Sequence, residues 1–227
     1  MKRLVLVGEG FGEASALPTL VAKLLEEKDA NRVFFVDREV IREPCPVRWD
    51  KDKNRPDFHK WVLRVTLASR RRDTGGVLAI YDGDAPSFPP GSGSPFCAAT
   101  AAKAMAAAAE GARAGKAFSL AVVFACVEYE TWLIAGIESL AGKQFKDGRP
   151  ALPAALKFPS GAPESHGKRW LEEVFPGYRP TLHQSALTEM LDLNLVRTRQ
   201  LRSFQRLEHA MDQLLAANHS GPHVSTP

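Results

Sequence analysis

Three pairs of acidic residues have spacings suited to metal binding, and each pair directly follows a short apolar run. The pairs are Glu9 and Glu13 in GEGFGE, Asp82 and Asp84 in DGD, and Glu128 and Glu130 in EYE. If the apolar runs are parallel strands, their carboxyl ends meet at one edge of a sheet, and the six carboxylates converge there. Such a group of anions is self-repelling, and a hard divalent cation that prefers oxygen ligands would relieve the repulsion. The pattern predicts a Mg²⁺ or Mn²⁺ site.

Each acidic pair also has a simpler interpretation when it is taken alone. Glu13 would complement the dipole of a helix if it stood in the first turn. The DGD pair would cap a turn in which Gly83 provides the bend, and the EYE pair would lie at the start of the helix TWLIAG. In an extended segment, however, alternate residues share a face, so both members of the DGD pair or of the EYE pair can address one ion. The conjunction of the three pairs, in this strand order, favours the metal site.

The GEGFGE turn also resembles part of a dinucleotide-binding fingerprint. That fingerprint needs G-x-G-x-x-G after a strand and an acidic residue after the next strand. Gly8, Gly10 and Asp37 fit, but the third glycine position holds Glu13, an anion placed where a pyrophosphate would lie. No Gly-Lys-Ser/Thr follows, so the phosphate-binding P-loop pattern fails too. A dinucleotide-dependent oxidoreductase is therefore disfavoured.

The elements that must position these acids alternate between strand and helix. Four runs are rich in Val, Ile, Leu and Phe without strict polar alternation, which is typical of buried parallel strands: RLVLVG, RVFFVDRE, GGVLAIYDGD and FSLAVVFACVEYE. Helical segments are expected at 14–28, 56–72 and 98–113, and further helices at 131–140, 166–175 and 199–217. We expect an α/β fold with a parallel sheet of about four strands flanked by helices, followed by a helical C-terminal extension. The expected division is 1–142 for the α/β domain, 143–217 for the extension and 218–227 for a disordered tail.

Composition and charge narrow the class of protein. The chain has 227 residues, 44% of them hydrophobic, and no apolar run near the roughly 20 residues that cross a bilayer. The first strand begins almost at Met1, which leaves no room for a signal peptide, so we expect a cytoplasmic protein without membrane contact. The three cysteines form no CxxC pair, so reduced thiols are expected rather than a disulfide framework or a zinc site. The loop 86–95, PSFPPGSGSP, cannot hold a helix and is interpreted as a lid or a substrate-facing loop beside the third strand.

Basic residues cluster near the end of the chain. Arg199 and Arg202 could hold a scissile phosphate beside the acidic edge, whereas the simpler interpretation is a solvated helix face. Trp132 is expected in the core. His166 and His183 are candidate phosphate-binding or proton-handling groups, but a lone histidine is more often structural.

These acids, in this strand order, resemble those of a Toprim domain, the metal-binding fold of primases, topoisomerases and overcoming-lysogenization-defect nucleases. Toprim proteins carry a glutamate after the first strand and D-x-D after the third, here Glu9 with Asp82 and Asp84. More narrowly, the chain resembles the Toprim-like domain-of-unknown-function family 4276. That resemblance rests on EGFGE at 9–13, DGD at 82–84, EYETWLIA at 128–135, HQSALTEMLDL at 183–193 and RSFQRL at 202–207. This chain differs from members with a longer acidic run after the third strand.

The resemblance implies a Rossmannoid Toprim fold and a Mg²⁺- or Mn²⁺-dependent nuclease acting on nucleic acid, in bacterial defence or a mobile element. On that basis Asp82 and Asp84 anchor one metal ion, and Glu9 shares it or acts as general base. Glu13, with Glu128 and Glu130, would recruit a second ion. The alternative function is a metal-binding regulatory module that works with a partner ATPase.

Overall fold

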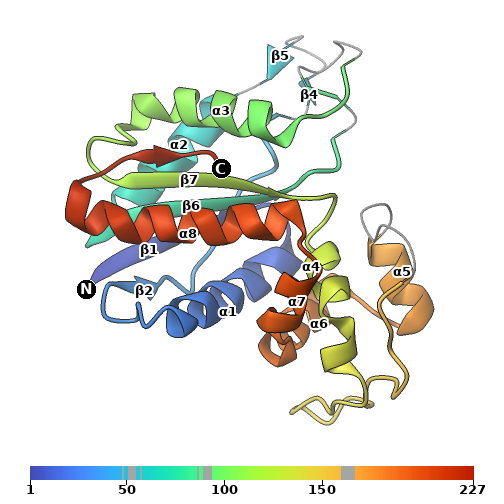
Figure 1. Cartoon of the computed structure of the whole chain (residues 1–227). Coiled ribbons are helices and arrows are strands. Elements are labelled where there is room, and N and C mark those ends of the chain that lie inside the picture. The colour runs from blue at the N-terminus through green and yellow to red at the C-terminus, as the bar shows by residue number, and fades with distance from the viewer. Residues whose placement is uncertain (48, 51–54, 57, 86, 89–93, 160–166) are drawn as a thin grey trace.

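The chain forms a parallel sheet with helices on both faces (Figure 1). The computed structural model describes residues 1–47, 49–50, 55–56, 58–85, 87–88, 94–159 and 167–227. The interpreted lid at 86–95 lies largely outside the described residues, and so does His166. Among the described helices, none is long and apolar enough to span a bilayer.

The main sheet has six strands, and every pairing in it is parallel. Its order is β2-β1-β6-β7-β8, and β3 also pairs with β1 beyond the end of β2. The strands are β1 (Lys2–Gly8), β2 (Phe34–Val36), β3 (Ile41–Arg42), β6 (Thr74–Asp82), β7 (Ser119–Ala125) and β8 (Val224–Ser225). A separate antiparallel pair is formed by β4 (Trp49–Asp50) and β5 (Arg55–Pro56). The predicted α/β class with a parallel sheet is confirmed.

Both faces of the sheet are buried, which explains why the strand sequences lack polar alternation. Leu6 of β1 packs in one hydrophobic cluster and the adjacent Val7 packs in the other, because successive side chains point to opposite faces. The first face is covered by α1 (Phe11–Glu27) and α8 (Arg202–Ser220). The second face is covered by α2 (Phe58–Ser69) and the alanine-rich α3 (Ala98–Ala109), which the short turn η1 (Glu110–Ala112) follows.

The helices between β7 and α8 gather beyond the carboxyl ends of the strands and along α1 (Figure 1). They are α4 (Glu130–Ala135), η2 (Ile137–Leu140), α5 (Gly167–Val174), α6 (Pro180–Met190) and α7 (Leu193–Thr198). Helix α6 packs on α1, and the Lys23 ammonium of α1 donates to the Thr188 and Glu189 carbonyls at 3.1 and 3.0 Å. The second half of the chain therefore shares a hydrophobic core with the first, and the boundary at 142 stays a prediction.

The tail differs from the prediction of disorder. Helix α8 continues to Ser220, and the chain then forms β8, in which Val224 pairs with Leu120 of β7. The physical reason is that β7 would otherwise end the sheet with open backbone groups, and a short parallel strand satisfies them. Composition alone could not reveal this pairing, because it depends on where α8 returns the chain.

The strand order places a topological switch point between β1 and β6. From β1 the chain crosses through α1 to β2 on one side, whereas β6 lies on the other side and leads through α3 to β7. Connections leave in opposite directions there, and in open α/β sheets ligands bind beyond the carboxyl ends of the strands at such a point. The GEGFGE and DGD segments begin at the carboxyl ends of these two strands.

Candidate functional site

Asp82, the last residue of β6, lies at the centre of the acidic edge. Its Oδ1 accepts a hydrogen bond from the Tyr129 amide at 2.9 Å, and its Oδ2 lies 3.7 Å from the Lys168 ammonium. Burial, followed by the nearby charge of Glu13, raises the pKa of Asp82 well above its ordinary value, and Lys168 opposes that shift. Glu130 raises the pKa of Asp82 further, so acids from two other segments act on this carboxyl group.

Glu130 begins α4 and is fully buried. Its Oε1 accepts hydrogen bonds from the Tyr178 hydroxyl at 3.0 Å and from Gln184 Nε2 at 2.9 Å. Its Oε2 has no hydrogen-bond partner among the described residues. Burial is the main reason that the pKa of Glu130 is raised. A buried carboxylate oxygen without a donor is costly, and a bound cation is one way to satisfy it.

Lys168 supplies positive charge within this acidic cluster. Its ammonium lies 3.5 Å from Glu128 Oε1, and its backbone amide donates to Glu128 Oε2 at 2.9 Å, so Glu128 also caps the start of α5. Burial lowers the pKa of Lys168, but Glu130, Asp82 and the other nearby carboxylates outweigh burial and raise it. One ammonium faces several carboxylates, which leaves an excess of negative charge when all of them ionise.

Neighbouring atoms lie so close to the two glycines of EGFGE, Gly10 and Gly12, that neither position has room for a larger side chain. A Cβ on Gly10 would lie 2.2 Å from Glu13 Oε2, because the Glu13 side chain folds back over the turn. A Cβ on Gly12 would lie 2.2 Å from Gln184 Oε1 and 2.8 Å from the Pro180 side chain, because α6 begins against the start of α1. The small glycines therefore leave space for the Glu13 side chain over Gly10 and for the Gln184 side chain beside Gly12.

The members of each predicted acidic pair are placed differently. Asp82 is buried whereas Asp84 is exposed, and Glu128 faces Lys168 whereas Glu130 faces Tyr178 and Gln184. Glu9 is half-buried directly after β1. Glu13 lies in the first turn of α1 and Glu130 in the first turn of α4, so the helix-start interpretation of these two residues also holds.

The acidic residue and the glycine turn that would bind a dinucleotide are engaged in other contacts. Asp37 accepts hydrogen bonds from Arg3 at 3.0 Å and Arg71 at 2.7 Å. The Glu13 carboxylate fills the space over Gly10. Both observations agree with the sequence argument against dinucleotide binding.

The predicted phosphate-binding arginines have other surroundings. Arg199 forms an ion pair with Glu138, and its guanidinium lies 4.2 Å from the centre of the Phe158 ring. Arg202 is exposed at the start of α8. His183 packs among aromatic rings and its Nδ1 accepts from the Arg179 amide at 2.9 Å, which is a structural role. Trp132 is buried as predicted, and its indole donates to Ser203 Oγ at 3.0 Å.

The oxygen-rich donor set fits a hard divalent ion in its chemistry. Glu13 and Glu130 raise the pKa of Asp82, all three acids raise the pKa of Lys168, and Glu130 Oε2 is a buried acceptor with no described donor. Within the described part of the chain, however, no three acidic, histidine or cysteine side chains are close enough to form a ready-made ligand group. Binding would require the side chains to close around the ion.

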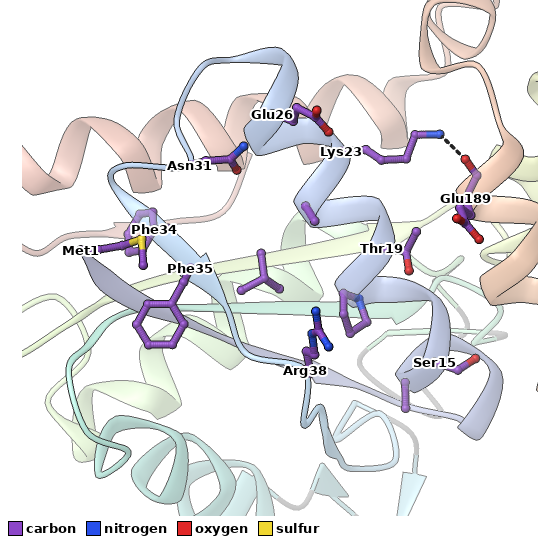
Figure 2. A pocket seen from close by; sticks show the side chains of 14 residues that line it. Met1, Ser15, Thr19, Lys23, Glu26, Asn31, Phe34, Phe35, Arg38 and Glu189 are labelled. Atoms are coloured by element: carbon purple, nitrogen blue, oxygen red, sulfur yellow. Dashed lines mark hydrogen bonds between the residues drawn. The ribbon is translucent and has the colours of Figure 1, made fainter.

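A separate hollow of about 810 Å³ lies between α1 and the edge strand β2 (Figure 2). Phe34, Phe35 and Arg38 line it on the strand side, and Thr19 and Lys23 line it along α1. The six predicted carboxylates do not line it. The acidic edge carries the chemically reactive groups, so we place the candidate site there and not in the hollow.

Sequence reasoning missed three residues of this site: Lys168, Tyr178 and Gln184. Gln184 stands in the HQSALTEMLDL segment, and the resemblance of that segment to the family's closing segment is the available signal. Lys168 and Tyr178 lie in segments without a recognisable motif, and only the packing of α5 and α6 brings them to Asp82 and Glu130.

Comparison with known proteins identifies the family but no characterised relative. No curated protein and no solved structure matches the chain. A family model described as a domain of unknown function, DUF4276, matches residues 8–212, which include every acidic residue of the candidate site. The chain therefore belongs to the DUF4276 family.

Proposed function

We propose that this protein hydrolyses phosphodiester bonds in nucleic acid with Mg²⁺ or Mn²⁺ held at the acidic edge. The observation that carries the proposal is the meeting of Glu13, Asp82 and Glu130 at the switch point, where burial raises the pKa values of Asp82 and Glu130 and the charges of Glu13 and Glu130 raise that of Asp82 further. Such perturbation costs folding stability, and it is expected where carboxylates are held together for function. The proposal includes a relationship to Toprim domains, supported by the acidic residues that follow β1 and β6.

Asp82, Glu13 and Asp84 are the residues that would hold the ion, and Glu9 would share it or accept a proton from the attacking water. A bound divalent ion would supply charge stabilisation for the phosphoryl oxygens and a nucleophilic water at neutral pH. Lys168 is placed to hold an anionic phosphate oxygen beside Asp82, because its ammonium already lies among the carboxylates. Tyr178 and Gln184 orient Glu130 and limit its movement.

A second candidate function is a metal-binding regulatory module that acts with a partner ATPase. The observation that favours it is the Lys168 ammonium, which already compensates part of the acidic charge and so could serve the fold alone. A module of this kind would bind metal but would not cleave nucleic acid without its partner.

The test is a cleavage assay with the whole purified chain. Single- and double-stranded DNA and RNA would be incubated with Mg²⁺ or Mn²⁺, and the parent compared with Asp82→Asn and Lys168→Met. Asp147→Asn is the matched control, because Asp147 is an exposed acid bonded to Arg149. We expect metal-dependent cleavage by the parent and by Asp147→Asn, and loss of at least about a hundredfold in Asp82→Asn. Equal cleavage by the parent and Asp82→Asn would contradict the proposal, and metal binding without cleavage would favour the module.

A further inference from the structure

Phe11 is an aromatic side chain exposed beside the acidic edge. It is the first residue of α1, between Glu9 and Glu13, and 66% of its surface is accessible. The large apolar side chains found exposed among the described residues also include Met1, Leu63, Leu67 and Leu182, so Phe11 is the aromatic member of that group. This ring lies two residues from each of two predicted ligands, Glu9 and Glu13, where an exposed aromatic face can contact a molecule bound at the acidic edge.

Arg42 covers this ring with its guanidinium. The Arg42 Cζ atom lies 3.5 Å from the centre of the Phe11 ring, close enough for a cation–π contact. The position is fixed by the sheet, since Arg42 of β3 pairs with Gly8 of β1 and the Glu43 amide donates to the Gly8 carbonyl at 3.0 Å. The Glu43 carboxylate next to it is buried and accepts from Arg64 Nε at 2.7 Å. The charge of this neighbouring acid is therefore compensated locally by Arg64.

We propose that Phe11 and Arg42 form a stacking platform for an unpaired base of a single-stranded nucleic acid. This inference rests on the proposed function and adds the substrate class and the residues that recognise it. Bases stack on aromatic rings and on guanidinium planes without regard to sequence, and Arg42 also offers a positive charge to the adjoining phosphate. A base on the platform would bring its neighbouring phosphodiester toward Glu9 and Glu13, which flank Phe11 in the chain.

Single-stranded nucleic acid fits this platform better than duplex. In a duplex the faces of the bases are already stacked on one another, so a ring at the protein surface reaches only the backbone and the groove edges. A protein-docking patch fits less well, because its centre would carry Glu9 and Glu13, and glutamate is depleted from protein interfaces. The net charge of +4 on the chain agrees with a polyanionic ligand.

The test measures binding separately from cleavage. Fluorescence anisotropy would use labelled oligonucleotides of about 12 residues, as single-stranded DNA, single-stranded RNA and duplex DNA. All proteins would carry Asp82→Asn, which removes one acidic charge and, on the proposed function, prevents cleavage. The variants are Phe11→Ala, Phe11→Trp and Arg42→Met, with Leu182→Ala as the control because Leu182 is another exposed apolar residue on a helix.

We expect Phe11→Ala to weaken binding of at least one single-stranded ligand about tenfold, and Phe11→Trp to preserve it. Arg42→Met should weaken the same ligand, and Leu182→Ala should leave it unchanged. The DNA and RNA arms show which sugar is preferred. The proposed platform would be refuted if Phe11→Ala left single-strand binding unchanged, or if it weakened duplex binding equally. It would also be refuted if the Asp82→Asn reference protein did not bind single strands. The cleavage assay is independent: duplex cleavage with no effect of Phe11→Ala would leave the proposed function standing and this inference refuted.

Discussion

Gln184 Nε2 donates to Glu130 Oε1 at 2.9 Å. The amide oxygen of the same side chain, Gln184 Oε1, lies 2.2 Å from the position that a Cβ atom on Gly12 would take. One glutamine thus joins three segments that are far apart in sequence: EGFGE, EYE and HQSAL. The contact is buried, and it fixes the start of α6 against the starts of α1 and α4. It gives a physical reason for the joint occurrence of these three segments in one chain.

Removal of this contact is expected to destabilise the fold. Gln184→Met has similar volume but no donor for Glu130, so the free energy of unfolding should fall by about 1–3 kcal/mol. Urea denaturation of the metal-free protein measures the change. Gln205→Met is the matched control, because Gln205 is exposed on α8. An equally small effect of both substitutions would show that the Gln184–Glu130 hydrogen bond contributes nothing to stability.

Glu130→Gln should not lower the free energy of unfolding near neutral pH, in contrast to Gln184→Met. The pKa of Glu130 is raised by burial, so the folded state holds its proton more tightly than the unfolded state. The stability that this group contributes is fully present below the unfolded value of 4.5 and is lost as pH rises through the raised pKa. The metal-free variant should therefore be at least as stable as the parent at pH 7. Its advantage should shrink as the pH falls toward 4.5, and a variant that is less stable at pH 7 would contradict this reasoning.

The two glycines of the turn should respond differently to alanine. Gly12→Ala meets Pro180 and Gln184 across the α1–α6 contact, and we expect a loss of about 1–3 kcal/mol because α6 must shift. Gly10→Ala meets only the flexible end of Glu13, so it should displace that carboxylate at smaller cost. Melting curves with and without Mn²⁺ separate the two effects. The expected pattern is a lower melting temperature for Gly12→Ala and a weaker metal response for Gly10→Ala, and the reverse pattern would refute our explanation of the motif.

Much of the fold could be predicted because it depends on local pattern. Runs such as RLVLV are apolar throughout, which specifies strands buried on both faces, and their alternation with helices specifies parallel pairing. Helices α6 and α7 were not predicted, because Pro180 and the short LNLVRT segment give weak periodic signals and their helical form depends on packing against α1 and α4. The carboxyl ends of parallel strands meet at one edge of a sheet, so the convergence of Glu13, Asp82 and Glu130 could be expected.

The partners of these acids could not be predicted for a physical reason. Lys168 reaches Asp82 only because α5 is capped by Glu128, and Tyr178 reaches Glu130 only because the chain turns before α6. These contacts join residues that are far apart in the chain, and no periodic pattern in the sequence indicates which residues will meet. The surroundings of Arg199 could not be predicted either. Its charge suggested phosphate binding, but its guanidinium pairs with Glu138 and lies over the Phe158 ring.

Asp37 provides a stability prediction independent of metal. Burial disfavours its charge, but hydrogen bonds from Arg71 and Arg3 outweigh burial and hold the pKa of Asp37 below its usual value. Asp37→Asn should lower the free energy of unfolding by about 1–3 kcal/mol at pH 7. The loss should shrink as pH falls from the unfolded value of 3.8 through the lower folded pKa, because the parent then loses the same charge. Asp212→Asn, which breaks a more exposed pair with Lys28, should cost less in the same urea titration.

The most direct test of the acidic edge as a metal site is a Mn²⁺ titration followed by electron paramagnetic resonance, which counts the free ion. We predict that the parent removes Mn²⁺ from solution, that Mg²⁺ displaces it, and that Asp82→Asn weakens binding by more than about tenfold. Asp147→Asn should bind like the parent, because its carboxyl lies in a separate exposed pair with Arg149. Failure of the parent to bind Mn²⁺ at millimolar concentration, or equal binding by Asp82→Asn, would contradict the account.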